Sequence, residues 1–237
     1  MTRWLLSCEH GGNQVPERWR HLFRDADTVL ESHRGWDRGS LDMFRALEAE
    51  IADAAYSAHV TRLLVDLNRS VGHRHLFSSY SRDLAPAEKQ QILEQYYLPW
   101  RMAVADRISG WRQDRHAVLH VSVHSFTPEL DGHRRNADIG LLYDPGRPLE
   151  RELSRCWRGL LADLAPDIRV RMNYPYRGTA DGFTRWLRAS NPSGYAGIEL
   201  ELNEGSIARR AAEITAAVLA SMRRLRSEFD PATVPAS

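Results

Sequence analysis

The sequence predicts an α/β fold in which a mostly parallel or mixed central sheet is covered by helices on both faces. Short apolar runs alternate along the chain with longer segments whose apolar residues recur at helical spacing, which is typical of strand–helix–strand units. The 237 residues contain no internal repeat and no linker-like stretch. We therefore expect residues 1–230 to form a single domain and the tail, residues 231–237, to be disordered.

The predicted strands are short apolar runs. Residues 117–124 alternate apolar and polar side chains, which places His120, Ser122 and His124 on one face. The same alternation in residues 195–202 places two glutamates together. The predicted strands are 4–8, 59–67, 117–124, 139–143, 167–172 and 195–202.

The predicted helices carry apolar residues three or four positions apart. Asp37 or Ser40 could cap the first helix, and Ser206 is expected to cap the last. Pro99 should kink or break the second, because proline lacks an amide hydrogen and clashes with the preceding turn. The predicted helices are 37–55, 86–113, 149–164, 181–189 and a final one from 206.

The composition excludes several classes of protein. With 32 basic and 31 acidic residues the net charge is +1, whereas nucleic-acid binding usually needs a basic excess. The cysteines, Cys8 and Cys156, are too few for a disulfide framework. The apolar run near the N-terminus is too short for a signal peptide or a membrane span. We therefore expect a cytoplasmic protein with no nucleic-acid or membrane partner.

The segment Arg62-Leu-Leu-Val-Asp-Leu-Asn-Arg69 is predicted to be a buried strand that ends in polar groups. Open α/β sheets bind ligands at such strand ends. A guanidinium beside an amide suits a carboxylate, so Asn68 and Arg69 are candidate substrate-binding residues, although Arg69 could instead pair with Asp66. Arg62 could stabilise an oxyanion or could equally be a surface arginine.

Two isolated histidines end predicted elements at the same edge of the sheet. His10 enters the turn Cys8-Glu-His-Gly-Gly-Asn13, and His124 ends the run Val121-Ser-Val-His124. Either could be a turn or core residue, but their shared edge favours a joint metal site. A catalytic zinc takes about three protein ligands and keeps one position open.

The third metal ligand is expected to be a carboxylate. Asp37 is the first candidate, with Glu9 and Asn13 behind it. Asp37 could equally be only a helix cap, so the sequence leaves this ligand open.

The paired glutamates Glu199 and Glu201 lie inside an apolar run. A buried unpaired carboxylate is costly, so the pair needs a metal, an arginine or a proton. Glu201 is nearer the carboxyl end of the strand and is the better general base, since desolvation would raise its pKa toward the working range. Glu199 could instead form a salt bridge with a core arginine.

Three more residues are candidates for substrate binding. Tyr176 and Arg177 lie in a polar, aromatic turn and could reach a ligand. Arg134 precedes a strand and could close over an anion, although a solvated loop is the simpler interpretation.

Taken together, these segments resemble the N-formylglutamate amidohydrolase family. The matching pieces span residues 7 to about 204 in the family's order: Cys-Glu-His-Gly-Gly-Asn-Gln-Val-Pro, Trp-Asp-Arg-Gly-Ser, Asp-Leu-Asn-Arg, Val-His-Ser-Phe, Tyr-Pro-Tyr-Arg-Gly and Gly-Ile-Glu-Leu-Glu-Leu. Asp-x-Asn-Arg is also similar to a motif of the aspartoacylase and succinylglutamate desuccinylase relatives in the zinc carboxypeptidase-like superfamily.

The resemblance implies a phosphorylase/hydrolase-like fold and zinc-dependent cleavage of an N-acyl amino acid. By position it implies His10 and His124 as zinc ligands, Glu201 as the base, and Asn68 with Arg69 as the holders of the substrate's α-carboxylate.

One position departs from the relatives' pattern. Asn13 stands where their His-x-x-Glu motif has its glutamate, which leaves Asp37 as the substitute ligand.

The sequence thus predicts a zinc amidohydrolase acting on a small carboxylate substrate, favouring N-formyl-L-glutamate, with formate and glutamate as products. Two alternatives remain open. One is another N-acyl-amino acid deacylase or a peptidoglycan-type amidase or carboxypeptidase. The other is a non-catalytic protein that kept the carboxylate pocket.

Overall fold

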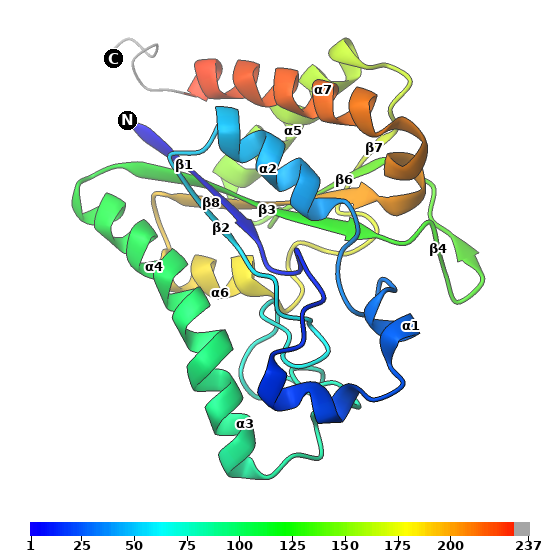
Figure 1. Cartoon of the computed structure of the whole chain (residues 1–237). Coiled ribbons are helices and arrows are strands. Elements are labelled where there is room, and N and C mark those ends of the chain that lie inside the picture. The colour runs from blue at the N-terminus through cyan, green and yellow to red at the C-terminus, as the bar shows by residue number, and fades with distance from the viewer. Residues whose placement is uncertain (230–237) are drawn as a thin grey trace.

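The computed structural model describes residues 1–229, so the predicted disordered tail lies outside the described residues. A six-stranded mixed sheet forms the centre, in the order β2-β1-β3-β8-β6-β7 (Figure 1). Its strands are β1 (Thr2–Cys8), β2 (Ala54–Ser57), β3 (Ala117–Phe126), β6 (Ile139–Leu142), β7 (Val170–Met172) and β8 (Tyr195–Asn203). Neighbouring strands pair in parallel except β6 and β8, which pair antiparallel. The predicted α/β class is confirmed.

Helices cover both faces of this sheet. On one face lie α2 (Ser40–Glu50), α5 (Pro148–Leu164) and α7 (Glu204–Phe229); on the other lie α4 (Leu98–Gln113) and α6 (Phe183–Ser190) (Figure 1). The remaining elements are η1 (Glu17–Phe23), α1 (Asp27–Leu30), α3 (Pro86–Ile92), the π-helical turn η2 (Leu93–Tyr97) and the hairpin β4 (Glu129–Leu130) and β5 (His133–Arg134). Among the helices of residues 1–229, none combines the length and hydrophobicity that crossing a membrane requires.

The strands present an apolar face to α2, α5 and α7. Leu6 of β1, Val121 of β3 and Ile198 of β8 join one buried cluster with side chains of these helices. Because side chains alternate along a strand, the intervening residues face α4 and α6. Toward the amino ends of the strands these are apolar, such as Leu5 and Val118, whereas toward the carboxyl ends they are polar. His124 of β3 and Glu199 and Glu201 of β8 lie on this polar half-face.

The segment predicted as a strand over 59–67 is instead a buried irregular loop, and the prediction was wrong. Its pairing is reduced to one bridge between Val60 and Gln14, followed by a turn at residues 62–64. The apolar side chains of this segment fill a second core with η1 and α3 rather than a sheet face. Side chains replace the missing ladder, since Thr61 Oγ1 donates to Gly35 O at 3.0 Å and Ser81 Oγ donates to Leu64 O at 2.8 Å.

The helix predicted over 37–55 is shorter than expected. It begins after Gly39, whose φ of +78° is a left-handed conformation that favours glycine, and it ends at Glu50. The edge strand β2, which the sequence did not predict, occupies residues 54–57. Asp37 is therefore not the helix cap, and its side chain is free for other contacts.

Two other local predictions change. The helical stretch continues past Pro99, but not as one regular α-helix: the π-helical turn η2 separates α3 from α4, and Pro99 lies in the first turn of α4. Ser206 does not cap α7; the side-chain oxygen of Asn203 accepts the Gly205 amide at 2.9 Å and the Ser206 amide at 3.3 Å.

Candidate active site

A cavity of about 160 Å³ opens at the carboxyl ends of β1, β3 and β8. Its size suits a small molecule rather than a folded or extended protein chain. The residues lining it are His10, Asp37, Arg62, Asn68, Arg69, His124, Ser125, Tyr176, Arg177, Ala180, Asp181, Glu199 and Glu201. Residues far apart in the sequence are thus brought to one edge of the sheet, as the strand polarity predicts.

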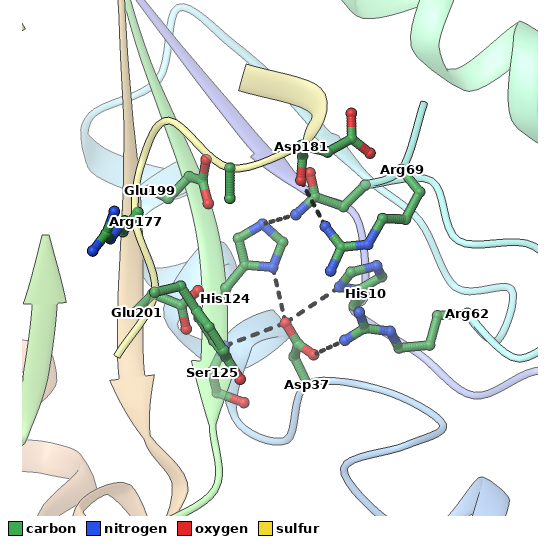
Figure 2. A pocket seen from close by; sticks show the side chains of 13 residues that line it. His10, Asp37, Arg62, Arg69, His124, Ser125, Arg177, Asp181, Glu199 and Glu201 are labelled. Carbon is green, nitrogen blue, oxygen red and sulfur yellow. Dashed lines mark hydrogen bonds and ion pairs between the residues drawn. The ribbon is translucent and has the colours of Figure 1, made fainter. Parts of the chain in front are cut away.

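Three buried side chains form a candidate metal centre. His10, Asp37 and His124 offer ligand atoms that all lie within 4.8 Å of one another. The Oδ2 atom of Asp37 lies 2.9 Å from His124 Nδ1 and 3.4 Å from His10 Nδ1. Figure 2 shows Asp37 between the two histidines and Arg62. Two imidazoles and a carboxylate are a typical donor set for a catalytic divalent metal.

The local backbone aims these groups inward. His10 follows β1 in a tight turn, where a side chain at Gly12 would lie 2.7 Å from the His59 carbonyl oxygen. The His10 carbonyl accepts the amide of Asp37 at 2.9 Å, which ties the turn to the segment before α2. His124 occupies the polar face of β3.

Each histidine uses its other ring nitrogen to contact a second carboxylate. His10 Nε2 lies 2.7 Å from Asp66 Oδ1, and His124 Nε2 lies 3.1 Å from Glu9 Oε2. Partners of this kind fix the tautomer and orientation of metal-binding histidines. In both rings the Nδ1 atom therefore faces Asp37.

Arg62 bridges two of the carboxylates. Its two terminal nitrogens donate to Asp37 Oδ1 at 3.1 Å and to Asp66 Oδ2 at 2.9 Å. Arg62 is therefore neither an unpaired surface arginine nor free to swing onto a substrate.

The charges at the cluster favour a dication. Burial alone would raise the pKa values of Asp37 and Asp66. At Asp37 the two histidines and Arg62 outweigh burial, and at Asp66 Arg62 and His10 do so, which holds both pKa values well below their usual range. Burial is likewise outweighed at Glu9, where His124 lowers the pKa to about 2. Three carboxylates and one guanidinium leave two negative charges around the histidine pair.

An unpartnered atom also fits a metal ion. His10 Nδ1 is buried without a hydrogen-bond partner, which is costly unless something binds it. Burial would lower the pKa of His124, but Asp37 and Glu9 raise it well above its usual range. A proton and a metal ion compete for such a nitrogen, so the donor set and the charge both fit a divalent metal.

The two strand glutamates lie on the far side of His124 from His10 (Figure 2). Glu201 pairs in register with His124, and its Oε2 atom is buried without a hydrogen-bond partner. Burial raises the pKa of Glu201 to about 8 and also raises that of Glu199. Glu199 accepts a hydrogen bond from the Thr184 hydroxyl and so is the more constrained of the two.

Asn68 and Arg69 line the same cavity and are held from behind. The side-chain oxygen of Asn68 accepts the Phe183 amide at 2.6 Å, and Arg69 Nη1 donates to the Asp181 carbonyl at 2.6 Å. Asp181 in turn accepts the Ser70 amide at 3.0 Å. Arg69 forms no ion pair with Asp66, whose partners are Arg62 and His10.

The other predicted residues divide between the cavity and the surface. Tyr176 and Arg177 line the cavity. Arg134 does not, because it lies exposed on β5 and lines a separate depression. Its neighbour Arg135 approaches instead, with Nη1 3.1 Å from the Tyr176 hydroxyl.

The other two candidates for the third metal ligand, Asn13 and Glu9, do not belong to the cluster of possible ligand atoms. Asn13 donates to the Leu30 carbonyl at 3.2 Å and to Glu31 Oε1 at 2.9 Å, away from the cluster. Glu9 lies behind His124 rather than beside Asp37.

Two residues of the site were not identified from the sequence. The Ser125 amide donates to Asp37 Oδ2 at 3.3 Å, and Asp181 holds the Arg69 loop. The position of Ser125 directly after His124 could have drawn attention to its amide, but no pattern in the sequence marked Asp181.

A buried histidine–carboxylate cluster, an unpartnered glutamate and the neighbouring Asn68 and Arg69 at the carboxyl edge of an α/β sheet define a hydrolase-type site with a candidate metal centre. The family model described as N-formylglutamate amidohydrolase matches residues 2–208. The chain belongs to that family, and it is an amidohydrolase.

Solved structures support the fold. The gene product Atu2144 from Agrobacterium tumefaciens is 28% identical, with a TM-score of 0.81 over 95% of this chain and 91% of that one. An N-formylglutamate amidohydrolase from Ralstonia eutropha JMP134 is 17% identical, with a TM-score of 0.71 over 95% and 94% of the two chains. The comparison with curated proteins found no match.

Proposed function

We propose that this enzyme hydrolyses the acyl group of an N-acyl amino acid, with N-formyl-L-glutamate as substrate and formate and glutamate as products. The observation that carries the proposal is the meeting of three kinds of group in one small cavity: a cluster that could hold a metal ion, a buried glutamate, and the pair Asn68 and Arg69, here called the clamp. Family membership supports the reaction class, and the cavity residues support the substrate class.

His10, Asp37 and His124 would hold one zinc ion. When bound, such an ion polarises the amide carbonyl and lowers the pKa of water to about 7. The rest of the reaction depends on where the chain's own residues place the substrate and the protons.

Glu201 is the proposed general base. Its unpartnered Oε2 would accept a proton from the attacking water and then deliver it to the amide nitrogen as the C–N bond breaks. The raised pKa suits both steps, because the group must gain a proton and release it in one turnover. Glu199, already bonded to Thr184, is the less suitable candidate.

Asn68 and Arg69 are proposed to bind the α-carboxylate. A guanidinium held at one nitrogen by the Asp181 carbonyl keeps other N–H groups for an anion. A substrate fixed there would have its acyl group close to the metal cluster. Tyr176 and Arg177 are proposed to contact the remainder of the substrate, including a second carboxylate.

Arg62 is proposed to orient Asp37 and Asp66. We prefer this role to the oxyanion role expected from the sequence, because both of its terminal nitrogens already donate to those carboxylates. Arg134 is not included in the proposed substrate site because it does not line the cavity.

A substrate screen tests the proposal. Purified, zinc-loaded enzyme would be assayed against N-formyl, N-acetyl and N-succinyl amino acids, each with a free or an amidated α-carboxylate. We expect the highest kcat/KM for N-formyl-L-glutamate and a large loss when the α-carboxylate is amidated. A preference for another acyl group would overturn the named substrate, and no turnover of any N-acyl amino acid would overturn the proposed substrate class.

A further inference from the structure

A buried carboxylate with no assigned role lies behind the metal cluster. Glu9 is fully buried on the polar half-face that β1, β3 and β8 share. Its Oε2 atom accepts a hydrogen bond from Ser122 Oγ at 2.7 Å and lies 3.1 Å from His124 Nε2. Its Oε1 atom accepts a hydrogen bond from Ser7 Oγ at 2.7 Å. Glu9 therefore contacts a proposed metal ligand from the side opposite the metal.

The hydrogen bonds behind Glu9 all run toward it. Burial lowers the pKa of His120 to about 4, so its ring is neutral and has one donor and one acceptor nitrogen. His120 Nδ1 lies 2.7 Å from the Tyr195 hydroxyl, which can donate to it, and His120 Nε2 lies 2.7 Å from Ser7 Oγ. With the proton on Nε2, the order is Tyr195 to His120 to Ser7 to Glu9.

The directions of these hydrogen bonds also determine which nitrogen of His124 carries the proton. Ser122 Oγ lies 2.9 Å from His124 Nε2 and uses its own proton on Glu9. The Nε2 atom therefore faces two acceptors, the Ser122 oxygen at 2.9 Å and the Glu9 carboxylate at 3.1 Å, and both lie closer than the one donor near it, Asn68 Nδ2 at 3.5 Å. An N–H on Nε2 satisfies both, and the lone pair then lies on Nδ1, which faces Asp37.

Glu9 differs from the buried carboxylates Asp37, Asp66 and Glu150 in having no permanent cation beside it. Asp37 and Asp66 are paired with Arg62, and Glu150 is paired with Arg188. Within residues 1–229 no arginine or lysine forms an ion pair with Glu9, whose ion-pair partner is His124. A fully desolvated carboxylate is costly without a compensating charge, and a cation at the His124 ring would supply one.

We propose that Glu9 is a positioning residue that holds His124 in the tautomer protonated at Nε2, so that Nδ1 is available to the metal ion. This inference rests on the proposed function, because it assumes a metal at His10, Asp37 and His124. It goes beyond that proposal by assigning part of the metal affinity to a residue that touches neither metal nor substrate.

The test compares zinc dissociation constants of metal-free wild type and Glu9→Gln in a chelator competition assay. The amide has no charge and can present an N–H to Nε2, which favours the opposite tautomer. Loss of a partner of this kind typically weakens metal binding about 10–100-fold, and we expect a change of that size in Glu9→Gln. Melting of the metal-free proteins is measured beside it.

Glu150→Gln is the matched control. Glu150 is equally buried, lies on α5 outside the cavity, and accepts hydrogen bonds from Arg188 Nε and the Gly197 amide, both at 3.0 Å. The same substitution there should lower the melting temperature without changing zinc affinity. An equal loss of affinity in both variants would show that Glu9 acts only through stability and would overturn the inference.

Two further outcomes are distinguishable. If wild type binds no metal, the proposed function fails. If wild type binds zinc and Glu9→Gln binds it equally well, only the role of Glu9 fails. Should Glu9→Gln not fold, Ser122→Ala removes the hydroxyl between Glu9 and His124, and a several-fold weaker affinity is expected. Unchanged affinity in that variant would contradict the proposed positioning.

Discussion

At the scale of single residues, Glu201 is the side chain on which the proposed chemistry depends most. It is buried beside His124, its Oε2 atom has no partner, and burial raises its pKa to about 8. These properties are unfavourable for folding but suit a group that exchanges a proton with the substrate.

Glu201→Gln should separate catalysis from metal binding. The amide keeps the shape of the side chain but cannot accept the proton, so we expect kcat to fall about 10²–10⁴-fold. The zinc content should stay equal to that of wild type, because Glu201 is not one of the proposed ligands. Steady-state kinetics on metal-quantified samples check this. Turnover at the wild-type rate would show that Glu201 is not the base.

The same variant should reveal the cost of burying this carboxylate. The folded pKa of about 8 lies above the ordinary value of 4.5, so between these values the unfolded chain releases a proton that the folded protein retains. Stability therefore falls as pH rises through this window and levels off above it.

Metal-free Glu201→Gln has no ionisable group at this position, so its stability does not fall with pH for this reason. Its unfolding free energy relative to metal-free wild type should rise between about pH 4.5 and pH 8 and then stay constant, reaching on the order of a few kcal/mol. Urea denaturation across this range measures it. A difference that does not change with pH would contradict the raised pKa.

At the scale of elements, the position of the proposed clamp, Asn68 and Arg69, depends on contacts between α4, α6 and the loop that carries these two residues. Arg101 of α4 is 3% exposed and lies 4.6–4.9 Å from the ring centroids of Tyr97, Phe183 and Trp186. Its Nη1 atom donates to the Leu67 carbonyl at 2.8 Å and contacts the Arg69 carbonyl at 3.3 Å. Arg101 thus holds the backbone on both sides of Asn68.

Arg101→Met should weaken this connection while keeping most of the apolar contacts. Loss of a charged hydrogen bond typically costs about 1.5–3 kcal/mol, and we expect a loss of unfolding free energy in that range together with a raised KM. Arg107→Met is the matched control. Arg107 lies exposed on the same helix, and its guanidinium carbon lies 5.7 Å from the ring of one aromatic residue, Trp111, instead of three. A KM that is unchanged in Arg101→Met would contradict the role of α4 in shaping the clamp.

The elements also show what the sequence could predict. Five of the six predicted strands correspond to β1, β3, β6, β7 and β8, because their apolar runs fill a sheet face. The run at 59–67 has similar composition but packs against η1 and α3. A short apolar run does not reveal whether it fills a sheet face or a loop core.

The placement of the candidate site residues at one edge of the sheet could be predicted more fully than the structure of the segment that carries Asn68 and Arg69. His10, His124 and Glu201 follow from strand polarity and alternation, and these depend on local sequence. The cavity nevertheless includes Asn68 and Arg69, although no strand carries them. Asp181 was missed because its role depends on a contact with Ser70, 111 residues away in the sequence.

At the scale of the whole molecule, one half-face of the sheet forms both the site and its support. Alternation gives β1, β3 and β8 an apolar face toward α2, α5 and α7, and an opposite face that is apolar at the amino ends of the strands and polar at their carboxyl ends. His124 and Glu201 of that face line the cavity, whereas Ser7, Ser122 and Glu9 lie behind them. Around the two histidines, the ionised carboxylates Glu9, Asp37 and Asp66 and the guanidinium of Arg62 leave a charge that a divalent ion would neutralise.

The metal content of the purified protein tests the central claim most directly. After incubation with zinc and removal of the unbound metal, elemental analysis of the whole chain should give one zinc per protein molecule. The ratio should fall well below one in His124→Ala, which removes a proposed ligand. A wild-type protein without stoichiometric zinc or another divalent metal would contradict the account of His10, Asp37 and His124 as a metal centre.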